Sequence, residues 1–153
     1  MIDNVEAALV TAFPGVKIDR AMIDEPTAHW SVYDDRADLA AFEGKTWRDL
    51  PAALLVRHST LPVYAGDALF RATLPGYLFY LLHERKQFND MPFQLSHQLT
   101  RKNDPASHPI FDRRIAPFTR AQRAAVRDVL AHLATVTPMQ DTMARALITW
   151  QNL

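Results

Sequence analysis

The feature that most constrains the fold is the apolar stretch over residues 68–82, ALFRATLPGYLFYLL, in which Arg71 is the only charged side chain. A proline inside a helix removes a main-chain N–H and crowds the preceding turn, so Pro75-Gly76 predicts one kinked helix or two shorter ones. The stretch is shorter and more interrupted than the roughly 18 to 20 apolar residues of a membrane span. We therefore expect it at the centre of the fold, covered by other elements.

Capping sequences predict two helices that cover it from the C-terminal side. Residues 119–122 have the Thr-x-x-Gln spacing of a capping box and precede an apolar stripe. Residues 137–140 repeat this pattern, with Pro138 at the first helical position. Further helices are expected over residues 3–13 with Asp3 as N-cap, 34–42, 46–50, 51–58 and 92–99. Residues 16–18 are expected to be extended, and much of 87–115 is expected to be surface loop because prolines recur there.

These elements predict an all-α fold: one compact helical bundle of about six to eight helices over residues 1–153. The long apolar helix can be covered only if the Trp47 turn and the two C-terminal helices pack on it. The expected shared core is Trp47, Phe70, Leu74, Tyr77, Leu78, Leu81, Leu130, Leu133, Leu147 and Trp150.

Composition excludes several classes of function. The 153 residues include 17 basic and 17 acidic side chains and no cysteine. A balanced charge removes the usual argument for a nucleic-acid or anionic-membrane partner, and the absence of cysteine excludes a disulfide scaffold, a thiolate nucleophile and a cysteine zinc site. The N-terminal sequence has acids where a secretory signal needs basic residues. We expect a bacterial-type cytoplasmic protein with no cofactor.

Charge is unevenly distributed along the chain. Residues 1–50 hold five basic and ten acidic side chains, whereas residues 85–127 hold nine basic and three acidic ones. One interpretation is that the two parts pack together through weak surface pairs. The other is that either part steers a protein partner into place. The candidate partner-binding residues are then Asp34, Asp35, Asp38, Arg113, Arg114, Arg120, Arg123 and Arg127.

None of the specific catalytic motifs is present, so no catalytic or metal-binding residue is assigned. The nearest approach to a catalytic or metal site is Asp104, His108 and Asp112, whose spacing of four would align them on a helix. Pro105 and Pro109 argue against a helix there, and a solvated loop is the simpler interpretation.

A ligand pocket is the other candidate for a site. Tyr64, Tyr77 and Tyr80 could line it, with Arg71 binding an anion, because an arginine on an apolar helix needs acceptors. The alternative interpretation is an ion pair inside the fold, and we expect the partner among Asp34, Asp35, Asp38 and Asp49.

Two motifs carry a resemblance to a known family. They are FxGKxWxDL over residues 42–50 and FRxxLPxYL over residues 70–78, followed by a closing helix after Phe118-x-x-x-Gln122. Together they resemble a family of small uncharacterised bacterial proteins, a domain of unknown function, in which a GKxWxDL turn precedes an FRYYLPAYL helix. Ala72-Thr73 departs from the paired aromatic residues of that pattern, and Gly66-Asp67 from its Thr-Pro or Ser-Pro helix start. The resemblance concerns mainly core residue types, so it implies a fold more than a function.

Three functions are consistent with the sequence. The first is a protein-binding protein without catalysis, and proteins of this size and character are often immunity proteins that neutralise a partner toxin. The second is a small enzyme or ligand-binding domain that uses the Arg71 pocket or the 104–112 segment. The third is a structural subunit that oligomerises through an apolar helix face. The absence of catalytic motifs and the uneven charge favour the first.

Overall fold

A computed structural model describes residues 2–25, 38–84, 90–136 and 138–153. Within these ranges every regular element is helical, which confirms the all-α prediction. The elements are α1 (Ile2–Ala12), α2 (Arg20–Asp24), η1 (Asp38–Phe42), η2 (Trp47–Asp49), α3 (Ala52–Arg57), α4 (Leu61–Tyr64), α5 (Asp67–His83), α6 (Met91–Leu99), η3 (Pro105–Ser107), α7 (His108–Ile115), α8 (Arg120–Leu133) and α9 (Gln140–Gln151). The described residues therefore hold nine α-helices, more than expected, because the sequence analysis did not identify α2, α4 and α7.

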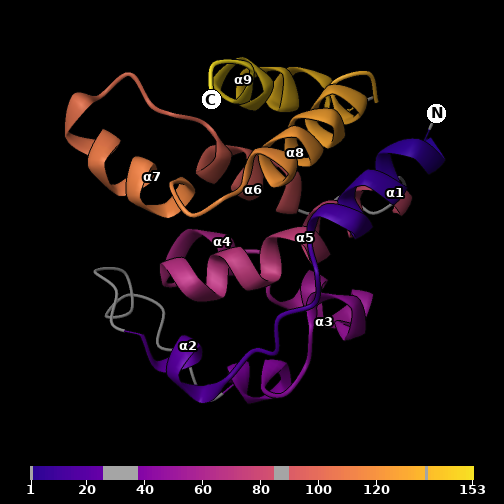
Figure 1. The fold of residues 1–153 in the computed structure, drawn as a ribbon, viewed down its shortest axis with the longest axis vertical. Helices are drawn as coiled ribbons and strands as arrows, with labels where there is room; N and C mark the ends of the chain where they lie inside the picture. Colours follow the sequence, from indigo (N-terminus) through magenta and orange to yellow (C-terminus); the bar gives the residue numbers. More distant parts are fainter. Residues whose placement is uncertain (1, 26–37, 85–89, 137) are drawn as a thin grey trace.

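Helix α5 is the centre of the molecule. It packs against α1, α2, α3, α4, α8 and η2, while α6 packs on α4 and α9. In Figure 1, α6, α8 and α9 lie on one side of α4 and α5, and α2 and α3 lie on the other. Pro75 lies inside α5, which continues through it as one helix. Proline cannot donate to the carbonyl of Arg71, so α5 lacks that one bond and is not divided.

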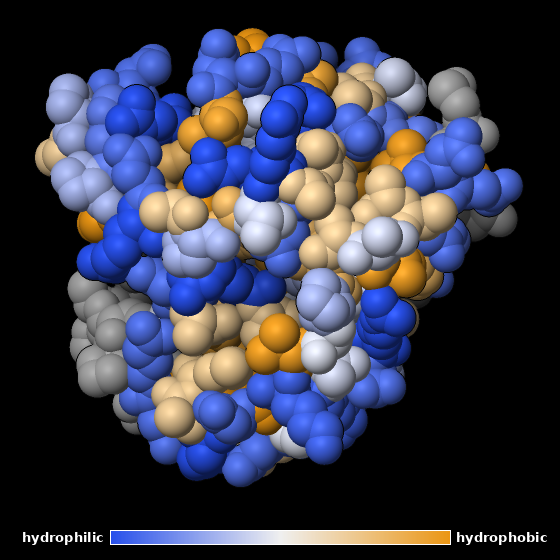
Figure 2. All heavy atoms as spheres, in the orientation of Figure 1, coloured by the Kyte–Doolittle hydropathy of each residue, from blue (hydrophilic) through white to orange (hydrophobic). Residues whose placement is uncertain are grey.

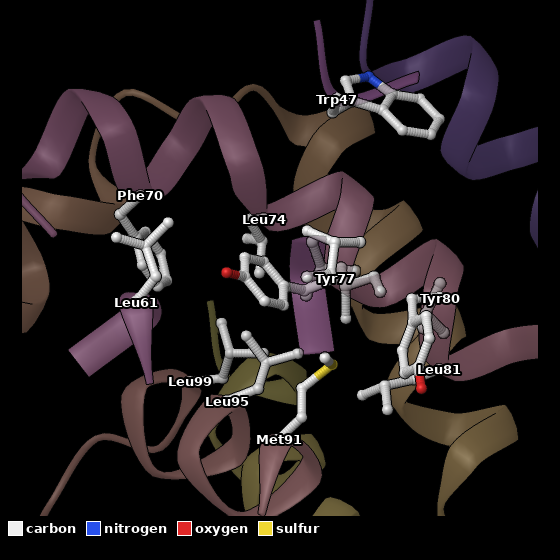
Figure 3. Packing of buried hydrophobic residues seen from close by; sticks show 14 of the residues in the cluster. Trp47, Leu61, Phe70, Leu74, Tyr77, Tyr80, Leu81, Met91, Leu95 and Leu99 are labelled. Atoms are coloured by element: carbon white, nitrogen blue, oxygen red, sulfur yellow. The ribbon is translucent and has the colours of Figure 1, made fainter. Parts of the chain in front are cut away.

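The expected core is confirmed. Nine of its ten residues are buried in one cluster, and Leu147 is partly buried against it. Figure 3 shows Leu74 and Tyr77 of α5 directed toward Leu95 and Leu99 of α6, with Trp47 on the other side of α5. The side chains of α5 are buried nearly all the way round the helix, as its apolar sequence predicts.

The capping boxes have different outcomes. The hydroxyl of Thr119 accepts from the Gln122 N–H at 3.2 Å and the Gln122 side chain accepts from the Thr119 N–H at 3.0 Å, which confirms the start of α8. Helix α9 begins later than predicted, at Gln140 with Met139 as N-cap, and Thr137 lies outside the described residues. At the other end of the chain Asp3 is inside the first turn of α1 and not its N-cap.

The chain after α1 brings Trp47 against α5. Residues 14–19 have no regular structure, and Ile18 exchanges main-chain hydrogen bonds with Gly44 (2.8 Å) and Lys45 (2.9 Å). Gly44 has φ of +77°, a conformation that side chains disfavour. The Trp47 indole then donates from Nε1 to the Phe13 carbonyl at 3.0 Å. These bonds fix Trp47 at the junction of α1, η2 and α5.

The region of residues 87–115 is more regular than predicted. Helix α6 confirms the expected helix at 92–99, but η3 and α7 occupy the segment expected to be loop. Pro109 is accepted in the first turn of α7, where its missing N–H has no helical partner in any case. The expected amphipathic helix at 34–42 is described only from Asp38, as η1, with Leu39 and Phe42 buried and Asp38 exposed. No helix in the described ranges is long and apolar enough to cross a membrane.

Candidate binding pockets

Trp47 forms a shared wall between two pockets. Its side chain is 5% exposed, and its ring centroid lies 5.9 Å from that of Phe79. A methyl group added at Gly76 would lie 3.4 Å from the Trp47 carbonyl oxygen, so η2 and α5 approach closely. The two pockets are consequently next to each other, one toward the start of α5 and one toward its end.

The first pocket, named here the Arg71 pocket, has a volume of about 280 Å³. Its lining is apolar apart from Arg71, Gln122 and the indole N–H of Trp47. The residues are Phe13, Pro14, Val16, Met22, Trp47, Ala68, Arg71, Ala72, Pro75, Pro117, Phe118 and Gln122. Both other polar groups are already engaged, because the Gln122 oxygen accepts from Thr119 and the Trp47 N–H donates to Phe13. The Arg71 guanidinium is the only charged group among the described residues that line this pocket.

Arg71 is half-buried and has no partner among the residues that the structure describes. The predicted ion pair is wrong for two of its four candidates. Asp38 Oδ2 lies 3.6 Å from Arg57 Nη2, and Asp49 accepts hydrogen bonds from the Thr46 N–H and hydroxyl instead. The other two candidates, Asp34 and Asp35, lie outside the described residues.

The second pocket, named here the His83 pocket, has a volume of about 420 Å³. It lies between α1, α3 and the end of α5, with an apolar wall and the polar side chains of Glu6, Arg48, His83 and Glu84. Glu6 Oε2 is 3.0 Å from His83 Nε2, and the Phe79 ring lies 4.6 Å from the His83 ring. The Arg48 guanidinium donates to the Val10 carbonyl at 2.7 Å and lies over the Trp47 ring.

The buried arginine of this fold is Arg114, which sequence analysis placed on a binding surface. Its guanidinium donates to Asp67 (3.1 Å), Gln98 (3.2 Å) and the carbonyls of Pro62 (3.3 Å) and Ala65 (2.8 Å). It also lies 4.4 Å from the centroid of the Phe70 ring. Arg114 thus joins α7 to α4, α5 and α6, and it is too enclosed to contact a partner.

Asp67 and Arg114 each affect the pKa of the other. Partial burial raises the pKa of Asp67, but hydrogen bonds from Arg113 and Arg114 and their positive charges outweigh this, so that its pKa is below the ordinary value. Burial lowers the pKa of Arg114, and Asp67 opposes the shift. Asp67 and the carbonyls around the guanidinium therefore compensate it for the water that it loses on burial.

The structure separates the residues of the predicted tyrosine pocket. Tyr77 is fully buried and donates its hydroxyl hydrogen to the His58 carbonyl at 2.7 Å, and burial raises its pKa. Tyr64 is also buried in the core. Tyr80 lines the His83 pocket, whereas Arg71 lines the other. Helical spacing was the missing criterion, since residues six and nine positions apart on α5 point in different directions.

The remaining partner-binding candidates differ in how strongly they are engaged. Arg113 donates to Asp67 at 2.7 Å, and Arg123 donates to the carbonyls of Ala116, Phe118 and Leu153. Arg127 lies 3.9 Å from Asp128, and Arg120 is exposed at the start of α8. The basic region is therefore partly used inside the fold, and Arg120 and Arg127 stay available at the surface.

Residues 104–112 are also engaged in structural contacts. Asp104 caps η3 by accepting from the Ala106 N–H at 3.1 Å, His108 Nε2 is 2.7 Å from the Lys102 carbonyl, and Asp112 accepts from Arg101 at 2.8 Å. The described residues contain no group of three His, Asp or Glu side chains that could hold a metal ion.

The chain matches no protein-family model, curated protein or solved structure in the three comparisons made with them. Its function must be inferred from the geometry of the two pockets and of the surface around them.

Proposed function

We propose that this chain is a binding protein without a catalytic centre, and that its partner is another protein. The observation that carries the proposal is the pair of neighbouring pockets on either side of Trp47. Protein partners commonly gain most of their binding free energy from a few side chains inserted into such pockets. Two pockets with a common wall suit two side chains of one partner segment.

The groups at the pockets support binding more than catalysis. The described residues that line the Arg71 pocket include no base or nucleophile, because they are one arginine, one glutamine and apolar side chains. The His83 pocket contains a histidine paired with Glu6, but no serine, threonine or cysteine is present among its described lining residues. A nucleophile and a base within hydrogen-bond reach are required for covalent catalysis.

The more specific form of this proposal is a bacterial cytoplasmic immunity protein that binds and neutralises a toxin. Its support is the small size of the chain, the exposed basic residues Arg120 and Arg127, and the motifs at residues 42–50 and 70–78 that resemble a family of small bacterial proteins. Exposed charges of one sign raise association rates with an oppositely charged partner.

Co-expression with the products of neighbouring genes tests the proposal. We expect the chain to restore growth of cells that produce one of these proteins, and the purified pair to bind in calorimetry. Ala68→Trp and Ala52→Trp fill the Arg71 pocket and the His83 pocket respectively, from half-buried and exposed positions. Ala131→Trp, on the exposed side of α8, is the matched control.

Loss of rescue in either pocket variant, with the control unaffected, is the expected result. Rescue that persists in both pocket variants would show that the pockets are not the partner site. Rescue that is abolished by His83→Gln while binding is unchanged would favour an enzyme.

A further inference from the structure

We propose that the Arg71 pocket is a binding site for a carboxylate attached to an apolar group. This inference deepens the proposed function, because it names the chemistry of the group that the pocket accepts. It starts from the contrast between the charge of Arg71 and the absence of an acceptor for it among the described residues.

The guanidinium has five N–H donors and retains its charge at all physiological pH values. Among the lining residues that the structure describes, the only side-chain oxygen belongs to Gln122, and it already accepts from the Thr119 N–H. A carboxylate presents two oxygens that match the guanidinium in a bidentate arrangement. Such a ligand would supply the acceptors that the pocket lacks.

The charges around the pocket do not cancel that of Arg71. Asp67, one turn before Arg71 on α5, is engaged by Arg113 and Arg114. Glu25 accepts from the Ala68 N–H at 3.3 Å, at the start of the same helix. On the opposite wall Arg123 places a second guanidinium against the Phe118 carbonyl at 3.2 Å. Asp67 and Glu25 therefore both accept hydrogen bonds from groups other than Arg71.

The remaining described residues of the lining are mostly apolar, which favours a ligand whose other part is an apolar group. Phe13, Met22 and Phe118 line the pocket together with prolines and alanines, and Val16 is 49% exposed beside it. Figure 2 shows one face of the molecule, on which apolar residues gather among polar ones near the middle. A volume of about 280 Å³ lies at the small end of ligand sites, which suits one side chain or a short-chain acid.

Nuclear magnetic resonance titration with sodium hexanoate tests the inference, with hexanamide as the uncharged control of the same size. The readouts are the Trp47 indole N–H and the Gln122 amide, which lie in the pocket lining. We expect saturable shifts with hexanoate at millimolar concentration and roughly tenfold to hundredfold weaker binding of hexanamide, because a hydrogen-bonded ion pair is lost.

Two variants identify the arginine responsible. Arg71→Met is expected to weaken hexanoate binding by roughly tenfold to hundredfold, and Arg71→Lys by less, since lysine keeps the charge but not the planar fork. Arg120→Met, which removes an exposed arginine near the pocket, is expected to change binding less than about twofold. Equal binding of hexanoate by wild type and Arg71→Met, or no shift at the pocket with any probe, would overturn the inference.

A second pair of probes distinguishes the source of the carboxylate. The peptide acetyl-Ala-Leu-Phe carries a free C-terminal carboxylate, and its C-terminal amide is the control. Binding of the free acid but not of the amide supports a protein ligand. Binding of hexanoate alone supports the inference with a free carboxylic acid as ligand, and it would count against the proposed protein partner at this pocket.

Discussion

Arg114 contacts the first turn of α5 through Asp67, Arg71 lies one turn further along α5, and the two guanidinium groups have contrasting surroundings. Arg114 is buried and donates to one carboxylate, one side-chain amide and two main-chain carbonyls. Arg71 is half-buried, lines an apolar pocket and has no acceptor among the described residues. The difference separates an arginine that stabilises the fold from one that is available to a ligand. Substitutions that remove one arginine at a time measure this difference.

The largest expected effect is that of Arg114→Met. Methionine fills the volume but leaves Gln98 and the carbonyls of Pro62 and Ala65 without their donor, so we expect a loss of about 3 to 5 kcal/mol in the free energy of unfolding. Urea denaturation at neutral pH measures it. The double variant Arg114→Met, Asp67→Leu should recover part of the loss, because no buried carboxylate remains. A loss below 1 kcal/mol for the single variant would mean that Arg114 is not the structural arginine.

The second expected effect is on acid stability. The pKa of Asp67 in the folded chain is below its ordinary value of 3.8. Its contribution to the free energy of unfolding is therefore fully present above the ordinary value, and it is lost as the pH falls through the lower pKa of the folded chain. Asp67→Asn is expected to cost about 1 to 3 kcal/mol at neutral pH, as for hydrogen bonds to charged groups. The difference between wild type and variant should shrink between pH 5 and pH 3. A difference that stays constant over this range would contradict the account of Asp67.

A third, smaller effect concerns the wall of the Arg71 pocket. Thr119→Ala removes the hydroxyl that accepts from the Gln122 main-chain N–H at the start of α8, and we expect a loss of about 1 kcal/mol. Thermal unfolding of the variant and of the control Thr11→Ala, an exposed position on α1, measures it. Comparable losses in the two variants would mean that the Thr119 capping box contributes little.

The smallest effect is that of Arg71→Met. Arg71 has no hydrogen bond or ion pair with the described residues, so its replacement by methionine removes none. We therefore expect the free energy of unfolding to change by less than about 0.5 kcal/mol or to rise slightly. Urea denaturation in the absence of any carboxylate buffer is the measurement. A loss of 2 kcal/mol or more would identify Arg71 as a structural residue and remove the basis of the ligand site.

The comparison of the two arginines also indicates how far sequence analysis could reach. Local signals were sufficient for α5 and α8, because an apolar run and a capping box depend only on neighbouring residues. The same reasoning missed α7, since Pro109 and the surrounding polar residues resemble a loop although the first turn of a helix accepts proline.

The ion pairs between distant side chains could not be predicted from the sequence. Arg114 and Asp67 are 47 positions apart, and no spacing rule connects residues on α7 with the start of α5. Arg71 was recognised as an arginine on an apolar helix, but nothing local indicates that it lines a pocket with Phe13 and Phe118. The composition of each pocket depends on long-range packing, so sequence analysis found one of its residues without its neighbours.

The most direct test of the central claim is the stability of wild type and Arg71→Met with and without saturating hexanoate. A ligand that binds only the folded chain raises its free energy of unfolding in proportion to the logarithm of its concentration above the dissociation constant. We predict similar stability of the two proteins without hexanoate, and a concentration-dependent rise with hexanoate that is clearly larger in wild type, because the variant binds more weakly. A lower stability of Arg71→Met without ligand, or an equal rise in both proteins, would contradict the assignment of Arg71 as a ligand-binding arginine.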